Sequence, residues 1–191
     1  MSITPKELRK KESESDDDEI KSVKGEPAKE FFVKMLTRDI ELPDAILDLL
    51  DNCIDGILRN EGPSATAKTP FKGFWAKISV FNKRFVIEDN CGGITLPLAH
   101  DSAFRLGSAA APHPERSIGT VGIGMQRALF KIGQHSIVHS HHKDHTFEVI
   151  IPPTWFSDSK SWDFSASVET PQKQSFGTII EVIQLHSSIA S

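Results

Sequence analysis

The feature that most constrains the fold is an amphipathic helix predicted over residues 42–60. At roughly 100° per residue, Asn52 lies about 40° from Asp48, and Asp55 lies about 20° to the other side of Asp48. The apolar residues of this segment cluster around the opposite direction: Ile46, Leu49, Leu50, Cys53 and Ile57. The helix must therefore bury one side, while its other side presents two carboxylates and an amide.

Two interpretations of this polar face stay open at this point. Carboxylate and amide oxygens in a row suit a hard cation that also carries phosphate. A surface helix with a solvated acidic face explains the same residues without any binding site. Two motifs further along the chain favour the binding site.

The composition fits one globular domain. The chain has 191 residues, of which 38% are apolar and 25% are charged, enough for one core but not for a second full domain. The net charge of −4 gives no support for a basic surface that binds nucleic acid or membranes. Because the sequence shows neither a transmembrane run nor a secretory signal, we expect a cytoplasmic protein. Two reduced cysteines, Cys53 and Cys91, fit that compartment.

Residues 1–26 differ in composition from the rest of the chain. Lys, Glu, Asp and Ser dominate them, so this segment cannot bury enough apolar surface to offset the entropy of ordering. We expect a disordered charged arm there. The ordered domain is expected over residues 27–185, with a short C-terminal tail at residues 186–191.

Helical and strand patterns alternate after the arm. The short link Asn82-Lys83 between two apolar segments predicts a hairpin. The order of elements predicts an α+β two-layer sandwich, with one helical layer on a mixed, mostly antiparallel sheet. The predicted helices are residues 28–37, 42–60, 96–106 and 125–132, and the predicted strands are residues 74–81, 84–88, 135–140, 145–151, 162–169 and 177–184.

The second motif, at residues 88–94, reads Glu-Asp-Asn-Cys-Gly-Gly-Ile and directly follows a predicted strand. Asp89 could accept a hydrogen bond from an exocyclic amine such as that of adenine, while Gly93 leaves room for the ring. A turn that uses Asp and Gly for conformational reasons alone is the alternative.

The third motif is the glycine-rich segment 119–127, Gly-Thr-Val-Gly-Ile-Gly-Met-Gln-Arg, which leads into a helix. Backbone N–H groups of such a turn, with the positive end of the helix, form an anion site. The pattern is not a P-loop and does not open a dinucleotide-binding unit. Residues 107–118, rich in small residues and proline, suit a lid that closes over a ligand, although an ordinary loop would look the same.

Together these motifs resemble the GHKL ATPase superfamily, which includes gyrase B, MutL, the ninety-kilodalton heat-shock chaperones and histidine kinases. That family carries E-x-x-x-N-x-x-D-A on a helix, then D-x-G-x-G, a lid, and G-x-x-G-x-G. The resemblance spans residues 27–185, and it is closest to prokaryotic MORC-like or chaperone-like ATP-binding proteins. The matching residues here are Asp48, Asn52, Asp55, Gly56, Asp89, Cys91, Gly93, Gly119, Gly122 and Gly124, with Thr178 near the start of the last strand.

The resemblance implies a Bergerat-type ATP-binding fold and a role for each matching residue. Asn52 would bind Mg²⁺, Asp89 would contact the adenine amine with help from Thr178, and Asp48 would act as the general base. The nucleotide-contacting set is Asn52, Asp55, Asp89, Gly93, Ile94, Gly119, Val121, Gly122, Ile123, Gly124, Met125 and Thr178.

Two departures from the family pattern bear on activity. Asp48 stands where many hydrolysing members carry Glu, and Cys91 stands where Gly is common. We expect slow Mg²⁺-dependent ATP hydrolysis coupled to lid closure and association. A nucleotide-gated interaction module that binds ATP without significant hydrolysis is the alternative. The resemblance also implies a homodimer, or a partner domain that supplies a lysine to the phosphates.

Other site classes fit the sequence less well. The histidines at positions 139, 141, 142 and 145 flank a predicted hairpin turn, and no further ligand completes a zinc set. The nucleophile-elbow motif of a serine hydrolase does not occur in the sequence. A histidine kinase would need a phosphoacceptor histidine upstream, and the first histidine of this sequence is His100.

Overall fold

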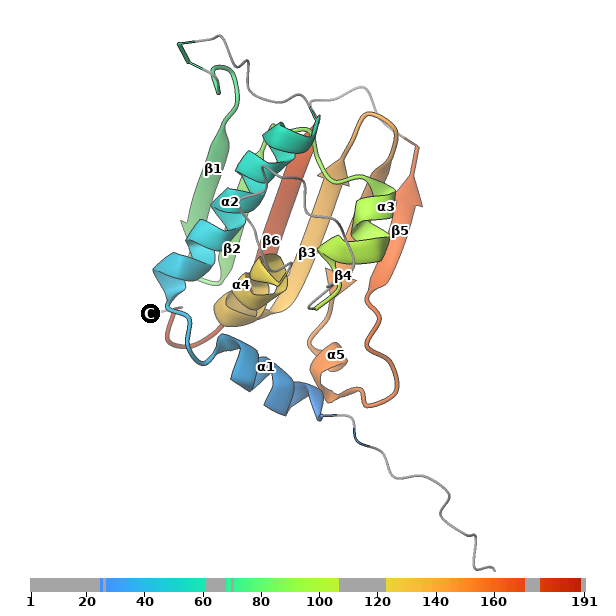
Figure 1. The fold of residues 1–191 in the computed structure, drawn as a ribbon. Coiled ribbons are helices and arrows are strands. Elements are labelled where there is room, and N and C mark those ends of the chain that lie inside the picture. The colour runs from blue at the N-terminus through green and yellow to red at the C-terminus, as the bar shows by residue number, and fades with distance from the viewer. Residues whose placement is uncertain are drawn as a thin grey trace, which may run out of the picture.

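A computed structural model describes residue 25 and residues 27–60, 68–69, 71–106, 123–170 and 176–189. These residues form a helical layer on one open sheet (Figure 1). The elements are α1 (Lys29–Thr37), α2 (Leu42–Asn60), β1 (Ala76–Phe81), β2 (Arg84–Asp89), α3 (Leu96–Leu98), the π-helix η1 (Ala99–Ala103), α4 (Gly124–Ile132), β3 (Gly133–His141), β4 (Thr146–Ile151), α5 (Thr154–Ser157), β5 (Ser165–Glu169) and β6 (Gly177–Leu185).

The sheet has six strands in the order β1-β2-β6-β3-β4-β5. Every neighbouring pair is antiparallel, so the described sheet is more regular than the mixed sheet expected. β6 lies between β2 and β3, which places the start of the last strand beside the end of β2. This topology brings Thr178 close to Asp89 although they are far apart in the sequence.

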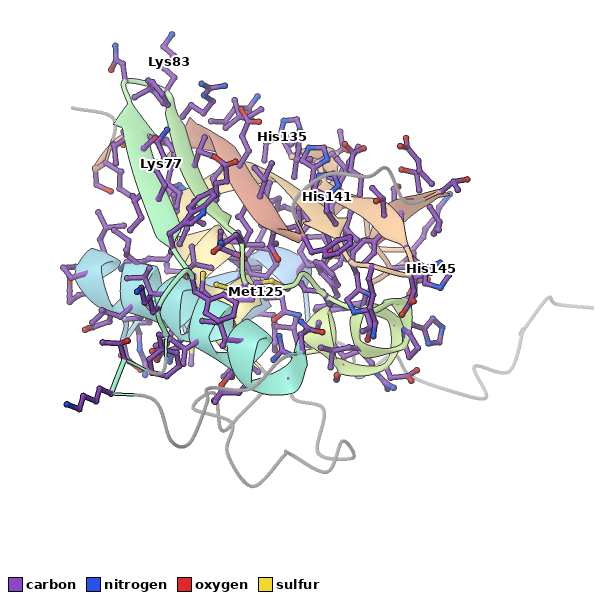
Figure 2. The ribbon with its side chains drawn as sticks, turned by 90° about the horizontal axis from the view of Figure 1, so that it is seen from above. Lys77, Lys83, Met125, His135, His141 and His145 are labelled. Carbon is purple, nitrogen blue, oxygen red and sulfur yellow. The ribbon has the colours of Figure 1, made fainter. Side chains whose placement is uncertain are left out.

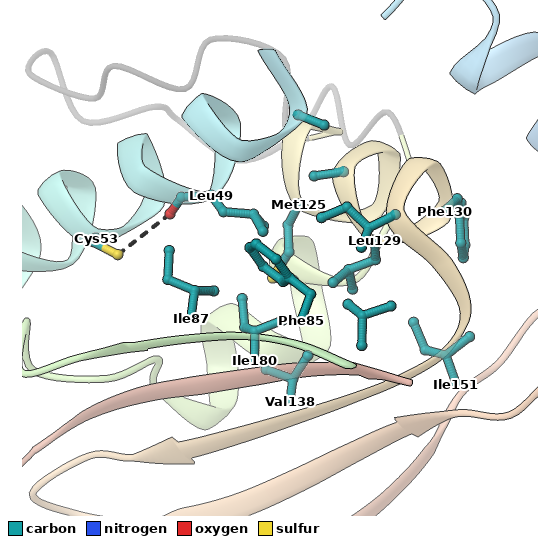
Figure 3. Packing of buried hydrophobic residues seen from close by; sticks show 14 of the residues in the cluster. Leu49, Cys53, Phe85, Ile87, Met125, Leu129, Phe130, Val138, Ile151 and Ile180 are labelled. Atoms are coloured by element: carbon teal, nitrogen blue, oxygen red, sulfur yellow. Dashed lines mark hydrogen bonds between the residues drawn. The ribbon is translucent and has the colours of Figure 1, made fainter. Parts of the chain in front are cut away.

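Helices α1, α2 and α4 cover one face of the sheet (Figures 1 and 2). Strand alternation sends Phe85 and Ile87 of β2 into the core, where they meet Leu49 of α2 and Leu129 of α4 (Figure 3). Each of these four side chains is at most 3% exposed. The α+β two-layer sandwich is therefore confirmed, and burial of this apolar layer drives its formation.

Lys29 fastens α1 to the segment around α5. Its ammonium group donates a hydrogen bond to the backbone oxygen of Trp155 at 3.0 Å and another to that of Ser161. The same group lies 4.4 Å from the centre of a Trp155 ring, a cation–π distance. Lys29 is buried because carbonyl oxygens and an aromatic face replace its water.

The element boundaries follow the predictions closely for the longer segments. Helix α2 spans the predicted residues, and the β1–β2 hairpin turns at Asn82-Lys83. The predicted helix over 96–106 is instead the short α3 followed by the π-helix η1, and α5 was not predicted. None of the described helices is long and apolar enough to cross a membrane.

Candidate functional site

Asp48 lies against the start of α4. Its Oδ2 accepts a hydrogen bond from Nη2 of Arg127 at 2.9 Å, and its Cγ is 3.5 Å from the place where a Cβ on Gly124 would be. The side chain of Asp48 is 24% exposed and that of Arg127 is 33% exposed, so water reaches this ion pair. The predicted general base therefore stands beside the helix that follows the glycine-rich segment.

The start of α4 presents backbone donors that no side chain of the described residues caps. Ile123 is the N-cap, and no side-chain hydrogen bond is made there. The first N–H groups of any α-helix lack an acceptor within the helix, and the helix dipole favours an anion beside them. Met125 points into the core (Figure 3), so its backbone alone is free for a ligand. Gly119, Val121 and Gly122 lie outside the described residues.

The polar face of α2 is partly or fully buried. Asp55 is only 4% exposed, and Nδ2 of Asn52 is buried with no hydrogen-bond partner among the described residues. Burial, together with the negative charges of Asp48 and Asp55, raises the pKa of Asp51. An unpartnered buried amide costs about 1–3 kcal/mol, so Asn52 would gain from a ligand or water that reaches it. Asp55 is therefore shielded from water, whereas Asp48 stays partly exposed.

Asp89 ends β2 with its carboxylate turned into the fold. Oδ1 accepts hydrogen bonds from the backbone N–H groups of Cys91 at 2.7 Å and of Thr178 at 3.3 Å. The thiol of Cys53 lies 3.5 Å from Oδ2. Burial raises the pKa of Asp89, and these hydrogen bonds partly oppose that shift. Asp89, Thr178 and α2 are thus brought together as the motifs predict, with Thr178 contacting Asp89 through its backbone.

The turn after Asp89 approaches other backbone segments very closely. Gly92 and Gly93 have φ angles of 94° and 72°, which L side chains rarely adopt. A Cβ on Gly93 would lie 2.6 Å from the backbone oxygen of His141. Glycine is therefore needed at both positions because of the positive φ angles and the close approach of neighbouring atoms. This requirement holds whether or not the turn binds a ligand.

Two residues that the sequence motifs did not single out hold this turn in place. The amide of Asn60, at the end of α2, donates to the backbone oxygens of Gly56 and Gly93, both at 3.1 Å. The buried hydroxyl of Ser140 on β3 accepts from the N–H of Ile94 at 2.7 Å and donates to its carbonyl at 3.0 Å. A small polar residue at an inward position of β3 was the only sequence signal for Ser140.

The predicted site residues therefore form two groups along one helix. Asp48, Asn52 and the start of α4 form the Asp48 group, while Asp89, Gly93 and Thr178 form the Asp89 group. Asp89 touches α2 at Cys53, five residues after Asp48, which is about 7.5 Å along the helix axis. The side chain of Ile94 packs in a small core cluster, and its backbone N–H and carbonyl are bonded to Ser140.

The histidines of β3 and of the β3–β4 turn are not part of either group. His135 and His141 lie on the sheet face away from the helices (Figure 2). His139 pairs with Glu148 across the strands at 3.3 Å. Within the described part of the chain, no three His, Cys, Asp or Glu side chains are placed to hold a metal ion.

One family model matches residues 40–183, about three quarters of the chain, and its description is histidine kinase-, DNA gyrase B- and HSP90-like ATPase. The chain belongs to this ATPase family. The matched segment of this GHKL ATPase domain contains both site groups, and membership supports ATP binding and possible hydrolysis. The superfamily predicted from the motifs is confirmed, while the narrower likeness to MORC-like or chaperone-like proteins stays a prediction. No curated protein matches the chain.

Proposed function

We propose that this GHKL domain binds ATP together with Mg²⁺ along α2 and hydrolyses it slowly. The observation that carries the proposal is the position of Asp48, whose carboxylate lies beside the start of α4, a helix end that no described side chain caps. At the other end of the site, Asp89 is held by two backbone N–H groups. The phosphates would lie at the Asp48 group and the adenine at the Asp89 group.

Asp89 is suited to select adenine. Its Oδ1 is occupied by backbone donors, while Oδ2 lies 3.5 Å from the thiol of Cys53, which is a weak donor. Oδ2 can therefore accept a hydrogen bond from the exocyclic amine of adenine. Thr178 lies beside this carboxylate, so its hydroxyl could assist through a water molecule.

Asn52 is suited to hold Mg²⁺ through its amide oxygen. The amide nitrogen, Nδ2, has no hydrogen-bond partner among the described residues, and Asn52 lies one helical turn from Asp48. Mg²⁺ in nucleotide sites keeps one or two protein ligands and takes the others from phosphate and water, which agrees with the lack of a three-residue metal cluster in the described segments. When bound, Mg²⁺ supplies positive charge that offsets the negative charge of the reacting phosphates.

Hydrolysis would use Asp48 as the proton acceptor. The carboxylate takes a proton from a water molecule whose oxygen bonds to the γ-phosphorus. The bond between that phosphorus and the β–γ bridging oxygen breaks, giving ADP and inorganic phosphate. The N–H groups at the start of α4 would bind phosphate oxygens and orient them.

A second candidate function is nucleotide-gated association without significant hydrolysis. The ion pair between Asp48 and Arg127 favours it, because a carboxylate oxygen engaged by a guanidinium is less available to water. The lid over residues 107–118 would then couple ATP binding to homodimerisation or to a partner domain that contributes a lysine. We place this domain over residues 27–185 of a cytoplasmic protein.

The rate at which inorganic phosphate is released from ATP in the presence of Mg²⁺ distinguishes the two candidate functions. The wild type is compared with Asp48→Ala, and thermal stabilisation by ATP shows that the variant still binds. Faster release by the wild type supports hydrolysis at this site. Equal release from the two proteins, with binding retained, would refute the enzymatic function and leave the nucleotide-gated module.

A further inference from the structure

No sequence motif assigns a role to Arg127, yet it contacts the proposed general base. Side chains of an α-helix point toward its N-terminus, and Arg127 follows this rule. It stands three residues after Gly124, and its guanidinium reaches back to Asp48, which lies over Gly124. Arg127 is therefore directed to the place where the phosphates would lie.

Arg127 has hydrogen-bonding capacity that Asp48 does not use. A guanidinium carries five N–H donors in a fixed fork. Nη2 binds Asp48, whereas Nε is buried and has no partner among the described residues. A phosphate group presents several oxygens that match such a fork. The unpartnered donor and the orientation of the side chain both suit a second anion beside Asp48.

The charge balance makes Asp48 and a terminal phosphate competitors for this cation. Helix α2 already presents the carboxylates of Asp48, Asp51 and Asp55, and burial and the other two carboxylates raise the pKa of Asp51. A triphosphate adds further negative charge to the same region. A guanidinium that turns from the carboxylate to the terminal phosphate offsets the added negative charge of that phosphate.

We propose that Arg127 is a specificity-determining residue that selects ATP over ADP, by exchanging Asp48 for the terminal phosphate. The inference rests on the proposed function, since it needs ATP in this site. The exchange moves hydrogen bonds and no covalent bond. When Arg127 binds the γ-phosphate, the Asp48 carboxylate is released to accept a proton from water.

The test measures affinity for two ligands in parallel by calorimetry on the full chain. The ligands are ADP and the non-hydrolysable β,γ-imido analogue of ATP, each with excess Mg²⁺. For Arg127→Gln we expect affinity for the triphosphate to fall about tenfold or more, as for loss of a charged hydrogen bond. Affinity for ADP should change less than about twofold.

Two further variants serve as controls. Lys131→Gln removes one positive charge from the same helix, where Lys131 contacts the backbone oxygen of Thr37 and not Asp48, and it should leave the preference for ATP unchanged. Arg127→Lys keeps the charge but loses the fork, so its preference should be intermediate. Thermal unfolding of each variant shows whether the domain is folded.

A double-mutant cycle gives the sharpest readout. Asp48→Asn removes the competing charge, so it should strengthen triphosphate binding, and more strongly in the wild type than in the Arg127→Gln background. An equal gain in both backgrounds would mean simple repulsion and would overturn the exchange. Equal losses for ADP and the triphosphate in Arg127→Gln, or no loss at all, would also overturn it. If the wild type binds neither ligand, the proposed function itself has failed.

Discussion

Gly56 and Cys91 pack against each other so closely that each restricts the other. A Cβ on Gly56 would lie 2.9 Å from the backbone oxygen of Cys91 and 3.3 Å from its Cβ. A glycine at position 56 therefore leaves room for the backbone and side chain of Cys91.

Gly56→Ala should destabilise the domain. Alanine favours a helix over glycine by about 1 kcal/mol, but overpacking against backbone costs about 1–3 kcal/mol. We therefore expect a net loss of up to about 2 kcal/mol in the free energy of unfolding, measured by urea denaturation. Gly124→Ala is the matched control, because its Cβ would meet Asp48 at ordinary contact distances. A stabilised Gly56→Ala variant would contradict the packing described here.

Asp89→Asn should weaken the binding of adenine nucleotides by about 1–3 kcal/mol, the range for loss of a charged hydrogen-bond partner. Asparagine keeps an acceptor for the backbone N–H groups of Cys91 and Thr178, so the turn should stay folded. Calorimetric titration with ATP measures the change. Glu88→Gln, one residue earlier on β2, removes a charge that lies outside the site and should bind ATP normally. Unchanged affinity in Asp89→Asn would exclude the adenine contact.

The same substitution should stabilise the domain in a pH-dependent way. Burial raises the pKa of Asp89 in the folded protein, so the unfolding free energy of the wild type falls as pH rises through that raised pKa. The asparagine side chain of the variant does not titrate, and the stability of Asp89→Asn relative to the wild type should therefore increase from acidic to neutral pH. Urea denaturation at several pH values measures it. A stability difference that shrinks toward neutral pH would contradict the assigned shift.

Ser140→Ala should destabilise the turn at Ile94. The change removes the hydroxyl that binds both the N–H and the carbonyl of Ile94 and leaves a buried N–H without a partner, at a cost of about 1–3 kcal/mol. Thermal unfolding measures the loss. Ser136→Ala, four residues earlier on the same buried face of β3, is the matched control. Equal losses in both variants would show that the contact with Ile94 is not what matters.

Local sequence patterns predicted the positions of the longer helices and strands well. They predicted which residues form the site, but not the contacts between them. Helix α2 and the β1–β2 hairpin carry strong periodicity and turn signals, so their positions followed from the sequence. Helix α5 has only four residues, too short for a helical period to show. The ion pair of Arg127 with Asp48 joins residues 79 positions apart, and the bonds of Ser140 to Ile94 join residues 46 apart. Such contacts depend on how the layers pack, and no local pattern encodes them.

Thermal unfolding with nucleotide tests the central claim, that this domain binds ATP with Mg²⁺ at α2, most directly. ATP at about a hundred times its dissociation constant should stabilise the folded protein by about 2.7 kcal/mol, seen as a higher melting temperature. The shift should be absent with GTP and reduced in Asn52→Ala. A melting temperature that ATP and Mg²⁺ leave unchanged, or that every nucleotide raises equally, would contradict the account.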